Sequence, residues 1–199
     1  MRPLIATLTC ALALAALPAA AVPVGKPAPD FTLNDVSGKP VKLSDFKGKY
    51  VVLEWVNPEC PYVQKHYNSG NLPALQKEYG EKNVTWLAIN SSNPRAGDYK
   101  TPAQMQTWMK QKSGAPGATL MDESGKVGRA YGARTTPHMY IIDPKGQTIY
   151  AGAIDDRPTA NPADVKSAKN FVRAAMGEAL SGKPVSAAST TPYGCTVKY

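Results

Sequence analysis

Cys60 is the residue of this chain whose type and position most clearly favour chemistry. It follows an apolar run, residues 50–56, that predicts a buried strand, and the segment after it predicts a helix. A thiol at the start of a helix lies near unpaired N–H groups and the positive end of the helix dipole, which favour the thiolate. Because the thiolate attacks peroxides and disulfides, the position indicates a redox role. The other interpretation is a buried structural cysteine, since free cysteines are often buried.

The N-terminal segment determines which cysteines the mature protein keeps. Residues 1–21 combine a basic residue, an apolar run and an Ala-x-Ala site, which predict a secretory signal peptide cut after Ala21. The alternative is an uncleaved membrane anchor, for which the apolar run is short. Export to the periplasm would remove Cys10 and leave Cys60 and Cys195. In that oxidising compartment they could form a structural disulfide, act as attacking and resolving thiols, or stay free.

The composition argues against several function classes. The formal net charge is +8, but the basic residues are scattered, so we expect a solvated surface that binds no nucleic acid and, after signal cleavage, no membrane. No closely spaced ligand pair such as Cys-x-x-Cys occurs, so neither a metal site nor another cofactor is expected. Residues 22–183 suit one domain, and residues 184–199 form a tail that carries Cys195.

The order of the expected elements predicts an α/β fold. Apolar runs and turn residues indicate strands and hairpins at 31–43, 50–56, 84–89, 118–121 and 139–151. Helical patterns cover 60–67, 73–79 with Gly80 as the stop, 101–112, 127–131, and Asn161 to Gly182. Strands joined by helices pair in parallel, so we expect a mixed central sheet flanked by helices, with an N-terminal hairpin. Cys60 would then lie at the carboxyl ends of the strands, where ligands tend to bind in such sheets.

Several segments resemble the redoxin branch of the thioredoxin-like superfamily, the alkyl hydroperoxide reductase/thiol-specific antioxidant group. They lie at residues 24–33, 41–49, 131–137 and 141–146. The surroundings of Cys60 and the terminal residues 193–199 are similar to a peroxiredoxin-like subgroup. The resemblance implies a thioredoxin-like fold and a thiol-dependent antioxidant activity.

The resemblance also implies where substrate binds. Pro137 would be preceded by a cis peptide bond, and Thr136 would then present its backbone groups to a substrate beside Cys60. Asn57 stands in the place of the peroxiredoxin threonine, and its amide could donate a hydrogen bond to a thiolate or a peroxide. The alternative for Asn57 is an ordinary turn or capping residue.

Charged and titratable residues could assist the thiol. His138 follows Pro137 and could raise the thiolate content of Cys60 or carry protons. Arg134 is a candidate electrostatic partner for the thiolate. Either residue could instead have an ordinary structural role. His66 lies six residues beyond Cys60, about 240° around a helix, so we expect it to face elsewhere.

Two departures from the resembling families leave the reaction open. The chain lacks Cys-x-x-Cys, and Leu53 stands where typical peroxiredoxins have proline. The leading hypothesis is an exported thiol oxidoreductase in which Cys60 attacks a peroxide or a protein disulfide, Cys195 is the candidate resolving thiol, and an external thiol is the reductant. The alternatives are a disulfide-exchange protein and a non-catalytic binding module with a structural Cys60–Cys195 bridge.

Overall fold

A central sheet organises the fold. The computed structural model describes residues 22–199, so the predicted signal peptide lies outside the described residues. The sheet has seven strands in the order β2-β1-β5-β4-β3-β7-β8. Their bounds are Thr32–Asp35 (β1), Pro40–Lys42 (β2), Val51–Trp55 (β3), Thr85–Asn90 (β4), Ala118–Met121 (β5), His138–Ile142 (β7) and Thr148–Gly152 (β8). A separate ladder joins β6, Thr135–Thr136, to β9, Cys195–Thr196.

The strands pair in both senses, which confirms the predicted mixed sheet. β3 pairs with β4, and β4 with β5, in parallel, whereas β7 pairs antiparallel with both β3 and β8. The N-terminal hairpin joins the same sheet through an antiparallel pairing of β1 with β5. β3 lies between two other strands, and all of its residues are buried. Cys60 follows the carboxyl end of this strand, as expected.

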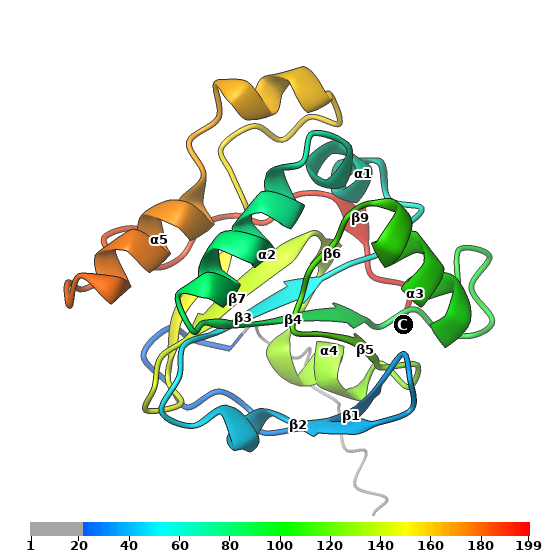
Figure 1. Cartoon of the computed structure of the whole chain (residues 1–199), viewed down its shortest axis with the longest axis horizontal. Helices are drawn as coiled ribbons and strands as arrows, with labels where there is room; N and C mark the ends of the chain where they lie inside the picture. Colours follow the sequence, from blue (N-terminus) through cyan, green and yellow to red (C-terminus); the bar gives the residue numbers. More distant parts are fainter. Residues whose placement is uncertain (1–21) are drawn as a thin grey trace, which may run out of the picture.

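Helices cover both faces of the sheet (Figure 1). One apolar core packs the sheet against α1, α2, α3 and α5, and a second packs it against α4 and the 3-10 helix η1. Their bounds are Pro61–Asn68 (α1), Asn71–Glu81 (α2), Pro102–Gln111 (α3), Lys126–Tyr131 (α4), Phe171–Leu180 (α5) and Leu43–Phe46 (η1). Within residues 22–199, no helix combines the length and apolar character that a membrane crossing requires.

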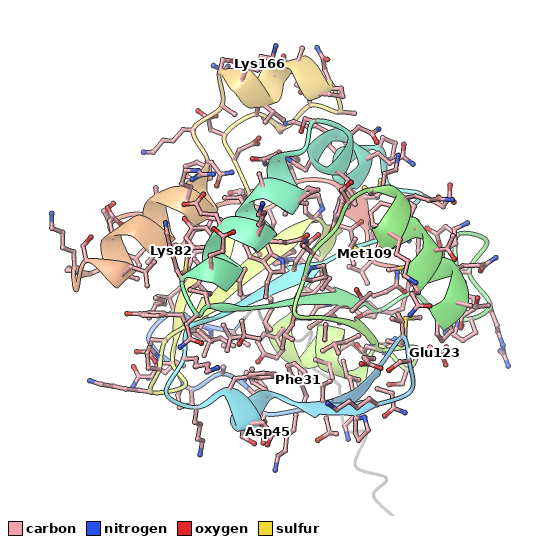
Figure 2. The ribbon with its side chains drawn as sticks, viewed as in Figure 1. Phe31, Asp45, Lys82, Met109, Glu123 and Lys166 are labelled. Carbon is pink, nitrogen blue, oxygen red and sulfur yellow. The ribbon has the colours of Figure 1, made fainter. Side chains whose placement is uncertain are left out.

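The side chains follow this layered arrangement. Met109 lies between α3 and the sheet, and Phe31, just before β1, packs in the second core against Tyr131 of α4 (Figure 2). Asp45, Lys82 and Lys166 are exposed at the outside of the molecule. The apolar residues therefore form two cores, one on each side of the sheet, as the alternation along buried strands requires.

The predicted start of α3 is confirmed, and the predicted stop of α2 is wrong. Thr101 accepts a hydrogen bond from the Gln104 backbone and Gln104 returns one, so the capping box at α3 is confirmed. Gly80 does not end α2, which continues to Glu81. The last turn of α2 carries the Tyr79 ring, which stacks on Trp86, and this burial outweighs the roughly 1 kcal/mol that glycine costs in a helix.

The predicted last helix is also wrong, because the chain forms two separate elements there. Asn161 caps only a short 3-10 helix, η2, Pro162–Lys166. The chain then turns back, and the backbone of Phe171 donates to Ile154 at 2.9 Å, which returns it to the end of the sheet. Asn170 caps α5 by accepting from the Arg173 backbone at 2.8 Å. A packing contact with the sheet therefore interrupts a segment that local propensity alone would continue.

Candidate functional site

Cys60 lies at the N-cap of α1, as the sequence predicts. It is 2% exposed and packs within the core that α1 shares with the sheet. Its side chain makes no capping bond to the helix backbone; the thiol donates instead to the carbonyl oxygen of Thr136 at 2.9 Å. The thiol is therefore placed by α1 on one side and by β6 on the other.

The peptide bond between Thr136 and Pro137 is cis, as the resemblance implies. It follows β6, a short strand that pairs with the tail of the chain. The tail forms β9 on this edge, with Cys195 directly opposite Thr136 in the antiparallel register. The Thr136 carbonyl that accepts from Cys60 therefore lies next to Cys195 as well, and the two cysteines of residues 22–199 meet at one backbone position.

Gly194 allows this close approach. Its φ is +136°, and a Cβ atom on it would lie 2.0 Å from the Thr136 carbonyl oxygen. Only glycine fits a backbone contact of this kind, because any side chain would overlap the carbonyl. The residue before Cys195 thus fixes how near the tail lies to β6.

Cys195 is the more exposed of the two thiols. Burial, the neighbouring Cys60 side chain and the Asp98 carboxylate raise the pKa of Cys195 to about 12. A thiol with so high a pKa keeps its proton at neutral pH, and protonated thiols are poor nucleophiles. The raised pKa therefore argues against Cys195 as the thiol that attacks a substrate first.

Asn57 is held by its own hydrogen bonds. Its amide donates to the Ser92 hydroxyl and to Asp98 Oδ2, both at 3.1 Å, and its carbonyl accepts from the Glu59 backbone at 2.8 Å. These bonds fix the turn between β3 and α1. In this state, the Asn57 amide supports the segment before Cys60 through that turn.

His138 and Arg134 differ in exposure. His138 lies on β7 opposite Trp55, is 2% exposed and accepts from the Arg134 backbone at 3.3 Å. Burial lowers the pKa of His138 to about 3, so its ring is neutral at pH 7. The Arg134 side chain is exposed and lines a hollow with Thr135 and tail residues 189–192. Neither a hydrogen bond nor an ion pair joins these two side chains to Cys60.

A buried polar cluster beside the site was missed by sequence reasoning. His66 Nε2 lies 3.1 Å from the Tyr193 hydroxyl. Burial lowers the pKa of His66 to about 4, which leaves the ring neutral at pH 7. Lys65 and Asp155 contact the same tyrosine. Of these residues only Tyr193 has a sequence signal, its place two residues before Cys195.

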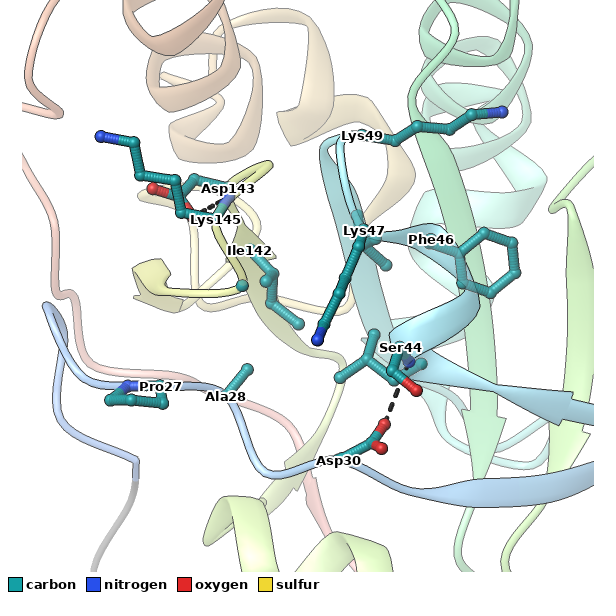
Figure 3. A pocket seen from close by; sticks show the side chains of 13 residues that line it. Pro27, Ala28, Asp30, Ser44, Phe46, Lys47, Lys49, Ile142, Asp143 and Lys145 are labelled. Atoms are coloured by element: carbon teal, nitrogen blue, oxygen red, sulfur yellow. Dashed lines mark hydrogen bonds between the residues drawn. The ribbon is translucent and has the colours of Figure 1, made fainter.

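The hollow in Figure 3 lies away from the thiols. It is lined by Pro27, Ala28, Asp30, Leu43, Ser44, Phe46, Lys47, Lys49, Val51, Ile142, Asp143, Lys145 and Gly146. Val51 begins β3 and Lys49 lies just before it, whereas Cys60 follows the end of β3. The hollow therefore lies at the opposite end of this strand from Cys60. Across the described part of the chain, histidine, cysteine and carboxylate side chains form no group of three that could hold a metal ion.

Comparisons with known proteins agree with the geometry. Residues 24–151 match the AhpC/TSA family. The thiol-disulfide oxidoreductase ResA of Geobacillus thermodenitrificans is 31% identical over 134 residues, which cover 64% of this chain and 67% of that protein. The crystal structure of an uncharacterized conserved protein from Geobacillus kaustophilus has 32% identity and a TM-score of 0.77, covering 89% of this chain and 92% of that one.

A second similar structure is that of a protein named for thiol-disulfide exchange. A putative thiol:disulfide interchange protein DsbE from Chlorobium tepidum has 25% identity and a TM-score of 0.54, covering 66% of this chain and 85% of that one. The family match covers more than half of the chain, and the matched segment contains Cys60. The chain therefore belongs to the AhpC/TSA family of the thioredoxin-like superfamily, and it is a thiol-based oxidoreductase.

Proposed function

We propose that Cys60 and Cys195 form one redox couple, which cycles between two thiols and an intramolecular disulfide. The observation that carries this proposal is the β6–β9 ladder, which places Cys195 opposite Thr136, the residue whose carbonyl accepts from Cys60. The ladder brings together two cysteines that lie far apart in the sequence. Two neighbouring thiols can donate two electrons and two protons to an oxidised substrate.

The favoured substrate is a disulfide. The Cys60 thiolate attacks one sulfur of the substrate, the substrate S–S bond breaks, and the first thiolate leaves. Cys195 then loses its proton to solvent and attacks the Cys60 sulfur, which releases the second thiolate and forms the Cys60–Cys195 bond. The substrate is reduced and the protein dithiol is oxidised. An external dithiol then attacks the Cys60–Cys195 bond, becomes a disulfide itself and restores both cysteines as thiols.

Peroxide is the second candidate substrate, because the chain matches the AhpC/TSA family. Here the Cys60 thiolate attacks one peroxide oxygen, the O–O bond breaks, and Cys60 becomes a sulfenic acid while water leaves after proton uptake. Cys195 then condenses with the sulfenic acid, and a second water leaves. Both substrates end in the same protein disulfide, so the couple is common to the two reactions.

Export completes the proposed function. The signal peptide expected at residues 1–21 would deliver the protein to the periplasm, where disulfide chemistry takes place. N-terminal sequencing of the protein from the periplasmic fraction should give Val22 as the first residue. Recovery of the uncleaved chain from the cytoplasm would contradict export.

Stoichiometric oxidation with intact-mass readout tests the couple. One equivalent of oxidised glutathione should convert the wild-type chain to its intramolecular disulfide. Cys195→Ser should stop at a glutathione adduct on Cys60, and Cys60→Ser should give no product at a comparable rate. Hydrogen peroxide in a parallel series shows which oxidant reacts faster. A wild-type disulfide that resists mild reductant would favour a structural bridge instead.

A further inference from the structure

A cluster of charged and polar side chains is buried between α1, the segment after β8 and the tail. Lys65 Nζ lies 3.3 Å from Asp155 Oδ2, with side-chain exposures of 0% and 1%. Lys65 also donates to the Arg157 carbonyl at 2.6 Å and to the Tyr193 hydroxyl at 3.2 Å. The Tyr193 hydroxyl donates in turn to Asp155 Oδ1. Tyr193 therefore ties the tail to a buried ion pair.

Stability alone explains this cluster poorly. A buried ion pair loses its hydration, and apolar residues of the same volume are often equally or more stable. Charged hydrogen bonds instead fix the relative position of the groups they join, because each requires a particular distance and angle. Lys65 belongs to α1, whose N-cap is Cys60, and Tyr193 precedes Cys195 by two residues. The cluster thus connects the element that places one thiol with the segment that places the other.

A second contact holds the tail on the far side of Cys195. The Tyr199 hydroxyl donates to the Ala133 carbonyl at 2.6 Å, and the Arg129 guanidinium lies 4.5 Å from the centre of the Tyr199 ring. A Cβ atom at Gly128 would lie 2.6 Å from that ring, so the glycine leaves the space in which it packs. Cys195 is therefore bracketed by two anchored tyrosines.

This arrangement conflicts with the first step of the proposed reaction. Cys60 is 2% exposed while the tail is docked, so a disulfide cannot reach its sulfur. The second step has the opposite requirement, since Cys195 must be docked to meet Cys60. The tail must therefore leave and return in each cycle, and the strength of its anchors affects the two steps in opposite directions.

We propose that Tyr193 is a positioning residue that sets the equilibrium between the docked tail and an undocked tail that admits substrate to Cys60. The proposal rests on the proposed Cys60–Cys195 couple. Lys65 and Asp155 hold the tyrosine hydroxyl in the docked state, and the hydroxyl is released to water in the undocked state. A weaker anchor raises the undocked fraction, which speeds attack by Cys60 and slows resolution by Cys195.

Ellman's aromatic disulfide separates the two steps, because each releases one coloured thiolate. Cys60 attacks the reagent, forms a mixed disulfide and releases the first thiolate. The bound aromatic group then occupies the place beside Cys60, so the tail must dock again before Cys195 attacks the Cys60 sulfur and releases the second. Two protons are lost, the reagent is reduced and the protein dithiol is oxidised. The two phases of colour therefore report undocking and redocking.

Tyr193→Phe tests the proposal with the smallest change available. The variant keeps the ring and removes the hydroxyl, while Asp155 keeps its bonds to Lys65 and to the Arg157 backbone. Loss of the hydroxyl contacts with Lys65, His66 and Asp155 should make the first phase about tenfold faster and the second about tenfold slower. Tyr50→Phe is the matched control, because it removes a tyrosine hydroxyl that donates to Ala179 at 3.0 Å, at the opposite edge of the sheet.

The outcomes separate this proposal from the one it rests on. Opposite shifts of the two phases in Tyr193→Phe, with wild-type phases in Tyr50→Phe, support the positioning role. A general loss of stability would not slow the second phase while speeding the first. Unchanged rates for either phase overturn the proposal and leave the couple intact. A wild-type chain that releases no second thiolate overturns the couple and this proposal with it.

A second variant keeps the test valid if Tyr193→Phe fails to fold. The Tyr62 ring packs edge-on against the Tyr193 ring, with centres 5.8 Å apart. Tyr62→Leu removes this contact and leaves the buried hydrogen bonds in place. It should shift both phases in the same directions as Tyr193→Phe but by a smaller factor, and wild-type phases in this variant would count against the proposal.

Discussion

Glu54 is a buried carboxyl group whose ionisation should control the stability of the fold. It lies on β3, is 0% exposed, and accepts hydrogen bonds from Tyr67, Gln76 and Trp86. Burial raises its pKa from 4.5 to about 7, although the three hydrogen bonds act in the opposite direction. Loss of hydration therefore raises the pKa by more than the three hydrogen-bond donors lower it. Glu54→Gln keeps the shape of the side chain and removes its ionisation.

The sign of the effect follows from proton binding. Between pH 4.5 and about 7 the folded chain holds a proton on Glu54 that the unfolded chain has released. The free energy of unfolding therefore falls as the pH rises through this window. At about 1.4 kcal/mol for each pH unit, the loss across the window is about 3 to 4 kcal/mol. Buried His66 and His138 act in the opposite direction below pH 6.5, because the unfolded chain binds their protons.

Urea unfolding at pH 5 and pH 8, under reducing conditions, measures this effect. The difference between Glu54→Gln and wild type isolates the carboxyl group, because both histidines remain in both proteins. The variant should gain about 3 kcal/mol relative to wild type between the two pH values. Glu59→Gln removes an exposed carboxylate and is the control, which should follow wild type. Parallel pH dependence of Glu54→Gln and wild type would refute the reasoning.

Two further changes test the surroundings of the thiols, and a third tests a helix cap. Gly194→Ala places a Cβ atom against the Thr136 carbonyl and should displace the tail. The first phase of Ellman's reaction at Cys60 should then be roughly tenfold or more faster. An unchanged rate would contradict the close contact. His138→Gln should keep the shape of the pH–rate profile for Cys60 alkylation between pH 5 and 8, because a pKa of about 3 leaves the ring neutral there, and a lost inflection would contradict this. Thr101→Ala removes the capping box of α3. It should lower the free energy of unfolding by about 1 kcal/mol in urea titrations and leave the thiol kinetics unchanged. A change in those kinetics would show that the start of α3 influences the site.

Much of the fold could be predicted because its signals are local. The apolar run before Cys60 is a buried strand because β3 has neighbours on both sides. Thr101 starts a helix because its hydroxyl and the glutamine three residues later satisfy each other's backbone groups. The errors arise where contacts between residues far apart in the sequence set the helix ends. Packing of Tyr79 favours the continuation of α2 beyond Gly80, and the contact of Phe171 with Ile154 divides the predicted last helix.

The site was only partly predictable for the same reason. The position of Cys60 at a helix start follows from neighbouring residues, so sequence reasoning found it. The pairing of Cys195 with Thr136 depends on a register between segments far apart in the chain, and no local pattern encodes it. Lys65 and Asp155 look like ordinary surface charges in sequence, and only the fold shows that they are buried against Tyr193.

A peptide map of the oxidised protein tests the central claim most directly. The wild-type chain is oxidised with one equivalent of a small disulfide, blocked with an alkylating agent, unfolded and digested with trypsin without reductant. The account predicts one linked product that joins residues 50–65, which carry Cys60, to residues 174–198, which carry Cys195. Recovery of Cys195 only in its alkylated form, with a lasting adduct on Cys60, would contradict the claim that these two thiols act as one couple.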